Sequence, residues 1–191
     1  MVEEARLEPL DSGLAPVSAG WFVVNVGDAA WLTNEAFGAR CLFEADVPVV
    51  RNRPELEPHR FRDLGFTIAV LEPGKPNSLY HSESADENFL VLAGECLLLV
   101  EEEERTLRAW DFVHCAPGTR HVFVGAGTGP CVLLMTGART PDKRIAYPAS
   151  QLARSHAAVA EEETDSAAEA YAAFPHWQPG RPSSWTNLPW A

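Results

Sequence analysis

A series of short apolar runs, each closed by a turn, dominates residues 66–136 and most constrains the fold. The runs occupy residues 66–71, 79–83, 88–92, 96–100, 106–115, 121–124 and 130–136. Glycine, proline or charged residues separate them, as at Pro73-Gly74, Ala93-Gly94 and Pro117-Gly118. No amphipathic pattern of helix length interrupts the series. Short strands with such punctuation predict an all-β antiparallel sandwich or barrel.

The segments on either side of these runs lack the same pattern, so we divide the chain into four expected parts. Residues 1–20 lack periodicity and are expected to form a loose leader. Residues 21–62 are expected to form an N-terminal arm with strands at Trp21–Asn25 and Gly38–Glu44, and a brief helical turn from Asp28 to Trp31. Residues 63–138 would be the barrel core. Residues 139–191 would be a helical, Trp- and Pro-rich extension, with helices capped by Ser150 and Asp165.

Three tryptophans lie in the last 17 residues, at positions 177, 185 and 190. A disordered tail would seldom carry so much aromatic surface. We therefore expect this segment to pack on the barrel or on a neighbouring subunit.

The charge balance argues against two classes of partner. The chain has 27 acidic and 15 basic residues, for a formal net charge of -12. Nucleic acids and anionic membranes are bound by clustered Lys and Arg, so neither is expected. The longest apolar stretch, 89–100, is shorter than the roughly 20 residues that span a bilayer. The acidic N-terminus has no signal-like apolar core, so a cytoplasmic location with four reduced, buried cysteines is expected.

Two histidines and two carboxylates stand among the short strands: His81, Glu83, Glu87 and His121. Neutral imidazoles and carboxylate oxygens together suit a divalent metal ion without any cysteine. His81 and Glu83 are two positions apart, so both side chains would point to the same face of an extended strand.

The spacing of these residues resembles the two motifs of the cupin superfamily, whose members form small double-stranded β-helix barrels of the jelly-roll type. The first motif is matched by Gly74, His81-Ser82-Glu83, Glu87 and Gly94. The second is matched by Ala116-Pro117-Gly118 and His121, after 15 intervening residues. The resemblance covers residues 60–138 and implies a barrel with a divalent metal such as Mn, Fe, Zn or Ni held by His81, Glu83, Glu87 and His121.

Several positions depart from the family pattern. Glu83 replaces the second histidine of the first motif, while Trp110 and Gly125 replace the opening glycine and closing asparagine of the second. Three His and one Glu leave a divalent ion with a net charge of about +1, whereas two His and two Glu leave about zero. The neutral shell should favour harder ions such as Mn²⁺ or Fe²⁺ over copper.

Three interpretations of the four residues stay open. All four bind the metal; or His81, Glu83 and His121 form a two-His-one-carboxylate face that Glu87 supports; or the barrel is metal-free and holds an organic ligand or a partner. Other polar residues are expected to play structural or solvated roles, namely His59, Tyr80, Asp111, His114, Arg120, His156 and His176.

The sequence indicates two broad classes of function and no specific reaction. One hypothesis is a metal-dependent enzyme that oxygenates or isomerises a small organic molecule. The other is a binding module that holds a small molecule with or without metal. Single-domain proteins of the resembled family often pair, so we also expect a homodimer.

Overall fold

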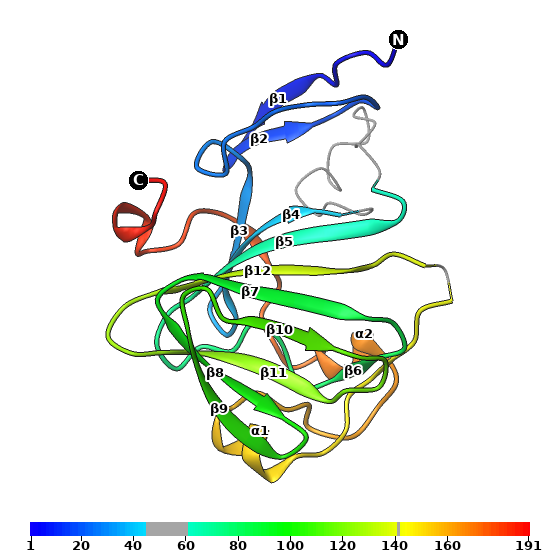
Figure 1. Ribbon diagram of the computed structural model, residues 1–191, viewed down its shortest axis with the longest axis vertical. Helices are drawn as coiled ribbons and strands as arrows, with labels where there is room; N and C mark the ends of the chain where they lie inside the picture. The colour runs from blue at the N-terminus through cyan, green and yellow to red at the C-terminus, as the bar shows by residue number, and fades with distance from the viewer. Residues whose placement is uncertain (45–60, 141) are drawn as a thin grey trace.

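Two antiparallel sheets face each other and enclose the interior of a barrel (Figure 1). The computed structural model describes residues 1–44, 61–140 and 142–191. The larger sheet contains, in spatial order, β10 (Phe112–Cys115), β7 (Glu87–Ala93), β12 (Cys131–Ala138), β5 (Leu64–Leu71), β4 (Gly38–Phe43), β3 (Trp31–Asn34) and β14 (Gln178–Pro179). The smaller sheet contains β11 (His121–Ala126), β8 (Glu95–Val100) and β9 (Glu103–Arg108). The short strands β6 (Ser82–Glu83) and β13 (Ile145–Ala146) pair separately.

Alternating positions on these strands fill the space between the sheets. Phe89 and Val91 on β7 contact Leu98 on β8, Phe123 on β11 and Leu133 on β12. Successive residues of a strand point to opposite faces, so the residues between them lie on the outer surfaces. The apolar runs in the sequence therefore form a barrel interior, and the predicted all-β jelly-roll fold is confirmed.

The predicted strand at residues 106–115 is divided in two. Trp110 has a positive φ of 77°, and the chain turns there between β9 and β10. The Asp111 carboxylate accepts a hydrogen bond from the Arg108 amide at 2.9 Å and closes this turn. Asp111 therefore has a structural role, as expected.

Gly94 has a φ of 73°, which is unfavourable for residues with a side chain. A Cβ atom at Gly94 would also clash with the carbonyl of Pro130. The tight turn at Gly94 connects β7 of the larger sheet directly to β8 of the smaller sheet.

The N-terminal segment is more ordered than its sequence indicates. Within the expected loose leader, β1 (Leu7–Leu10) and β2 (Gly13–Pro16) form an antiparallel hairpin. Ala15 and Val17 are buried beside Ala30, so small apolar side chains anchor the hairpin without the periodicity of a long strand.

Two local expectations in the N-terminal arm are wrong. Trp21–Asn25 is not a strand, although Trp21 forms an isolated bridge with Glu4. The expected turn of helix at Asp28–Trp31 is absent, because Trp31 begins β3 and its side chain is fully buried. The predicted strand at Gly38–Glu44 is confirmed as β4, whereas most of the connection that follows it lies outside the described residues.

The C-terminal extension contains two short helices. Helix α1 (Gln151–Ser155) begins at Ser150, whose hydroxyl accepts a hydrogen bond from the Ala153 amide, as predicted. Helix α2 (Ala167–Ala170) is capped by Ser166 and not by Asp165, because the Ser166 hydroxyl accepts from the Glu169 amide.

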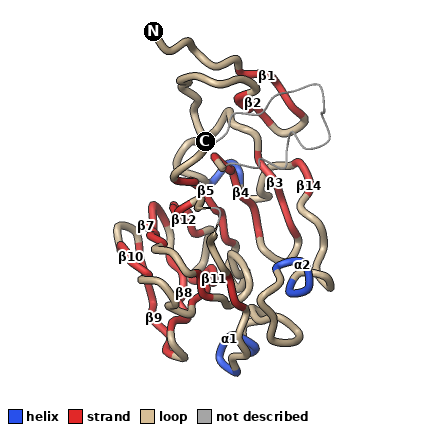
Figure 2. The backbone as a smooth tube through the Cα atoms, turned by 90° about the vertical axis from the view of Figure 1, so that its right-hand side faces the viewer, coloured by secondary structure: helices blue, strands red, loops and turns tan. Residues whose placement is uncertain are grey.

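The part of the Trp-rich segment from Trp185 to Trp190 packs against the outer face of the large sheet. Trp185 and Trp190 lie 5.5 Å and 5.4 Å from Trp31 between ring centroids, and Leu188 joins the same buried cluster. Strand β14 extends the sheet beside β3 (Figure 2). The expectation that this segment packs on the barrel is confirmed.

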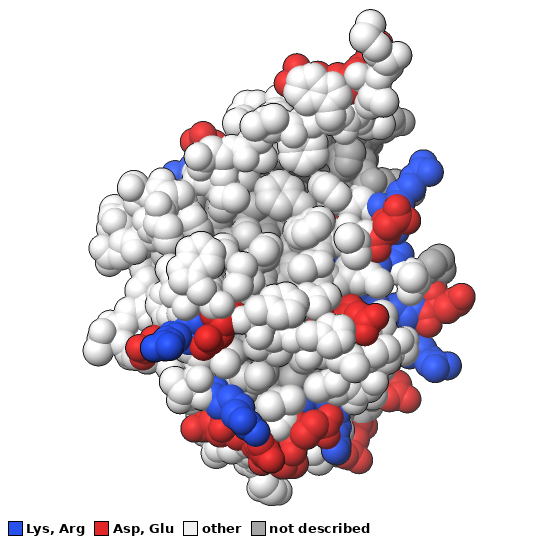
Figure 3. All heavy atoms as spheres, viewed as in Figure 1, with Lys and Arg blue, Asp and Glu red and all other residues white. Residues whose placement is uncertain are grey.

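Charged side chains are unevenly distributed over the surface. Figure 3 shows few of them in the middle of the face formed by β7, β10 and β12, whereas both signs gather near β8 and β9. Trp110 and Phe112 are exposed on or beside β10. The expected homodimer remains a prediction. No helix in the described part of the chain is long and apolar enough to cross a membrane.

We predict that Trp31→Ala lowers the free energy of unfolding by about 3–5 kcal/mol, because it leaves a cavity beneath Trp185 and Trp190. Trp21→Ala is the matched control, since Trp21 is half exposed, and it should cost about 1 kcal/mol or less. Urea denaturation of both variants measures the difference. Equal losses would show that the C-terminal segment does not depend on Trp31.

Candidate metal centre

His81 and His121 lie directly opposite each other on adjacent extended segments. The His81 amide donates to the His121 carbonyl at 3.1 Å, and the His121 amide donates to the His81 carbonyl at 2.8 Å. Residues paired in this way across antiparallel segments place their side chains on the same face. The two imidazole rings accordingly lie 4.8 Å apart between centroids.

Each imidazole is oriented by a backbone carbonyl two residues earlier. His81 Nδ1 lies 2.7 Å from the Leu79 carbonyl oxygen, and His121 Nδ1 lies 3.1 Å from that of Thr119. A carbonyl oxygen can only accept, so Nδ1 carries the proton in both neutral rings. The Nε2 lone pairs are then available to a metal ion, the arrangement found for metal-binding histidines.

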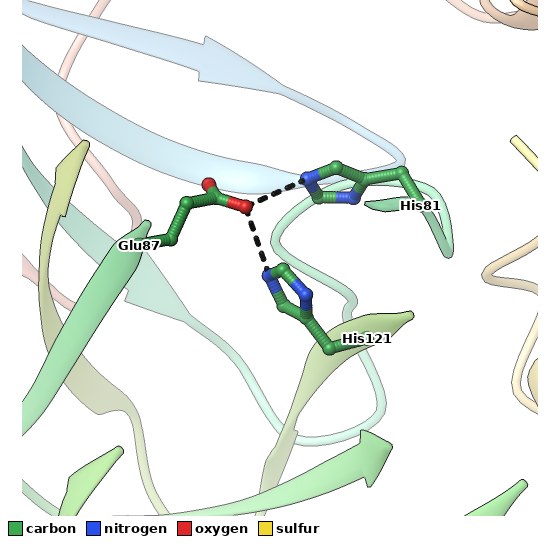
Figure 4. A group of neighbouring side chains, drawn as sticks. All are labelled: His81, Glu87 and His121. Carbon is green, nitrogen blue, oxygen red and sulfur yellow. Dashed lines mark ion pairs between the residues drawn. The ribbon is translucent and has the colours of Figure 1, made fainter. Parts of the chain in front are cut away.

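Glu87 completes a group of three potential ligands (Figure 4). Its Oε2 atom lies 3.6 Å from His121 Nε2 and 4.0 Å from His81 Nε2. Glu87 begins β7, so it approaches the two histidines from the larger sheet. One carboxylate oxygen and two imidazole nitrogens thus converge from three separate segments.

Burial shifts the pKa values of all three groups toward the neutral forms. Desolvation lowers the pKa of His81 and of His121 to about 4. Desolvation, followed by the nearby carboxylate of Glu83, raises the pKa of Glu87 to about 8. At pH 7 both imidazoles are therefore neutral, and Glu87 is largely protonated in the absence of a cation.

The residues present fit a divalent metal ion. Glu87 Oε2 and His121 Nε2 are buried and have no hydrogen-bond partner, a costly arrangement inside a protein. Metal bonds of about 2.1 Å allow one ion to join donors as far apart as about 4.2 Å. The two carboxylate–imidazole separations of 3.6 Å and 4.0 Å fall inside that limit, and all three ligand atoms lie within 4.8 Å of one another. A cation would satisfy both orphaned atoms at once.

Glu83 lies in the same cavity but is not part of this group. Both of its carboxylate oxygens accept hydrogen bonds from Lys143 Nζ at 2.8 Å. The structure therefore brings together three of the four residues predicted to be ligands and places the fourth on a lysine. The metal role predicted for Glu83 stays a prediction.

The other polar candidates have separate surroundings. Tyr80 is buried between β11 and the segment around α1, and exposed Arg120 forms an ion pair with Glu101. His114 is half exposed and bonds with Asn88, and His156 contacts Glu104. His59 lies outside the described residues. His176 lines a surface cavity and a second cavity that Arg40 also lines. All four cysteines are buried and unpaired, as expected.

Sequence reasoning missed the basic residues of the cavity. The cavity has a volume of about 380 Å³, and Arg40, Arg139 and Lys143 line it beside His81 and Glu87. A signal was present for Arg40, which alternates with Ala39 and Cys41 in a strand and so had to face the opposite side. Lys143 and Arg139 follow the last barrel strand, and no pattern in the sequence brings them back to the site.

Comparison with known proteins identifies a family domain. Residues 67–137 match the family model described as "Cupin domain". A search of curated proteins found no match.

Several solved structures are similar to part of the chain. A sugar phosphate isomerase of the cupin superfamily from Silicibacter pomeroyi is 28% identical over 47% of this chain and 59% of its own, with a TM-score of 0.45. A putative sugar phosphate isomerase from Acidithiobacillus ferrooxidans is 23% identical over 56% and 64%, with a TM-score of 0.45. A cupin 2 conserved barrel domain protein from Rhodopseudomonas palustris is 17% identical over 61% and 70%, with a TM-score of 0.44.

The chain spans less than two thirds of the length of the first two structures. The family model covers β5 to β12 almost completely, including Glu87 and both histidines of the candidate centre. Together with the motif spacing and the jelly-roll arrangement of strands, this match shows that residues 67–137 form a cupin domain.

Proposed function

We propose that this cupin binds one divalent metal ion through His81, Glu87 and His121 and uses it on a small organic molecule in the barrel cavity. The observation that carries the proposal is the pair of buried, unpartnered atoms, Glu87 Oε2 and His121 Nε2, which face each other at 3.6 Å. A cavity of about 380 Å³ beside them leaves room for a small molecule.

The ligand set suits several ions. Two neutral imidazoles and one carboxylate leave a divalent ion with a net charge of about +1 and open positions, which fits Fe²⁺, Mn²⁺, Zn²⁺ or Ni²⁺. When bound, the ion would supply Lewis-acid polarisation of a substrate oxygen.

The side chains around the site support proton-transfer chemistry, such as isomerisation, as the reaction to test first. Glu83 is a carboxylate in the wall of the cavity and can accept a proton from a substrate carbon. Lys143 holds both Glu83 oxygens, which fixes the direction of the carboxylate. Oxygenation, the other reaction considered from the sequence, would need no such base.

The same ion pair favours a second candidate function. Because Lys143 donates to both oxygens of Glu83, part of the acceptor capacity of this carboxylate is already used. A protein that binds a small molecule without converting it would tolerate this arrangement.

We predict that His121→Ala lowers the affinity for added Zn²⁺ or Mn²⁺ more than about 100-fold, because it removes a buried ligand. His114→Ala is the matched control, since His114 is half exposed and outside the ligand group. Elemental analysis of untagged protein purified without chelator, together with titration of added metal, measures the effect. A wild-type protein that neither contains nor takes up metal would refute the proposed site.

Glu83→Gln should leave metal occupancy nearly unchanged and abolish proton exchange on a substrate. Exchange is followed by NMR in D₂O on a panel of small sugars and diketones, with oxygen consumption recorded in parallel. Occupancy lost as fully as in His81→Ala would instead make Glu83 a ligand. Proton exchange that survives in Glu83→Gln would exclude Glu83 as the base. A wild-type protein that shows neither proton exchange nor oxygen consumption would favour the binding function.

Metal affinity should rise with pH between about 5 and 8 and level off above 8. The Glu87 pKa of about 8 means that a bound ion must displace a proton below that pH, whereas the histidines, with pKa values of about 4, are already neutral. One displaced proton corresponds to about a tenfold gain per pH unit. Calorimetric titration in buffers of different ionisation enthalpy measures this proton release, and a pH-independent affinity from 6 to 8 would contradict it.

A further inference from the structure

Arg40 places an unusual positive charge inside the barrel. On β4, Ala39 and Cys41 face the buried cluster around Trp31, so Arg40 lies on the opposite face of the strand. Its cross-strand partner is Ala69, which belongs to the interior core. The Arg40 side chain accordingly lines the same cavity as His81 and Glu87.

Arg40 forms no direct ion pair with any described residue, although the Glu44 carboxylate lies near enough to act on its charge. Arg139 bonds with Glu44, and Lys143 bonds with Glu83, so the other two cations of the cavity are paired. The Arg40 Nε atom is buried and lacks a hydrogen-bond partner. Such an unpaired buried donor is costly unless an acceptor reaches it.

The charges of the cavity wall leave an excess of positive charge once the metal is present. Arg40, Arg139 and Lys143 are balanced by Glu44, Glu83 and ionised Glu87. A divalent ion, which rests on the function proposed above, would then leave a net charge of about +2. An anionic group on the bound molecule would offset it, and a guanidinium donates two parallel hydrogen bonds to a carboxylate or phosphate.

A second, aromatic cavity begins at Arg40. Arg40, Asn77 and Ser78 line both the metal cavity and a neighbouring cavity of about 470 Å³. Phe37 on the β3–β4 connection lines the second cavity together with Tyr171, Phe174 and Trp177 of the C-terminal extension. The Arg40 guanidinium carbon lies 3.7 Å from the centroid of the Trp177 ring, so the cation stands at the junction of the two cavities.

We propose that the molecule bound by this cupin is a small organic anion carrying an aromatic ring. Its carboxylate or phosphate lies on Arg40 at the edge of the metal cavity, and its ring packs among Phe37, Phe174 and Trp177. Arg40 is thus the residue that selects an anion, and the C-terminal extension is the part of the chain that selects an aryl group.

The test uses isothermal titration of the full-length, metal-loaded protein with three matched probes: 3-phenylpropionate, the neutral alcohol 3-phenylpropan-1-ol, and propionate, which lacks the ring. Phenyl phosphate, in a separate arm, distinguishes phosphate from carboxylate. One of the two aryl anions should bind at least about tenfold more tightly than the neutral alcohol and than propionate.

Arg40→Met should weaken binding of the aryl anion by at least about tenfold, and Arg120→Met, at an exposed ion pair, should leave it unchanged. Arg40→Lys keeps the positive charge but lacks the paired N–H donors of the guanidinium, so it should also bind the aryl anion more weakly. This variant replaces Arg40→Met if Arg40→Met does not fold. Phe174→Ala should weaken the aryl anion but not propionate.

Three results would overturn the proposal. The first is an alcohol that binds as tightly as both aryl anions, and the second is an Arg40→Met protein that is folded and binds like the wild type. The third is failure of both aryl anions to bind a metal-loaded wild type. Metal content is measured on every sample, so Arg40-dependent binding to a protein that takes up no metal would refute the metal function and leave the anion site standing.

Discussion

The candidate centre depends on one backbone interaction, the reciprocal pair of hydrogen bonds between His81 and His121. This pairing puts both imidazoles on one face and keeps their rings 4.8 Å apart. Carbonyl oxygens of Leu79 and Thr119 then fix which nitrogen carries the proton, and the other nitrogen faces Glu87. A shift of one residue in this pairing would turn one imidazole to the outer face and separate the ligands.

Around that pair, the cavity brings together polar groups that would be unfavourable in isolation. Glu87 and His121 have orphaned atoms, Glu83 is paired with Lys143, and the buried Nε of Arg40 lacks an acceptor. An interior built only for stability would contain apolar side chains at these positions. In the proposals made above, a cation at the histidines and an anion at Arg40 would satisfy these groups.

The barrel could be predicted from the sequence because alternation along short strands reports directly on which face is buried. The grouping of His81, Glu87 and His121 could likewise be predicted from their spacing, since the turns at Gly94 and Gly118 set the strand lengths between them. The N-terminal hairpin was missed because small residues such as Ala15 and Val17 anchor it through tertiary contacts. The surroundings of Glu83 were hidden for a similar reason, because Lys143 reaches it from 60 residues away.

The β14 strand and the tryptophans that follow it have a consequence for synthesis of the chain. Leu188, Trp185 and Trp190 cover Ile68, Val70 and Val132, which the ribosome adds more than 50 residues earlier. Until residues 178–190 emerge, the outer face of the large sheet and the β3 edge are open to other chains. The nascent protein therefore carries an apolar surface prone to association until residues 185–190 have been synthesised, and that surface closes only after the barrel strands beneath it are complete.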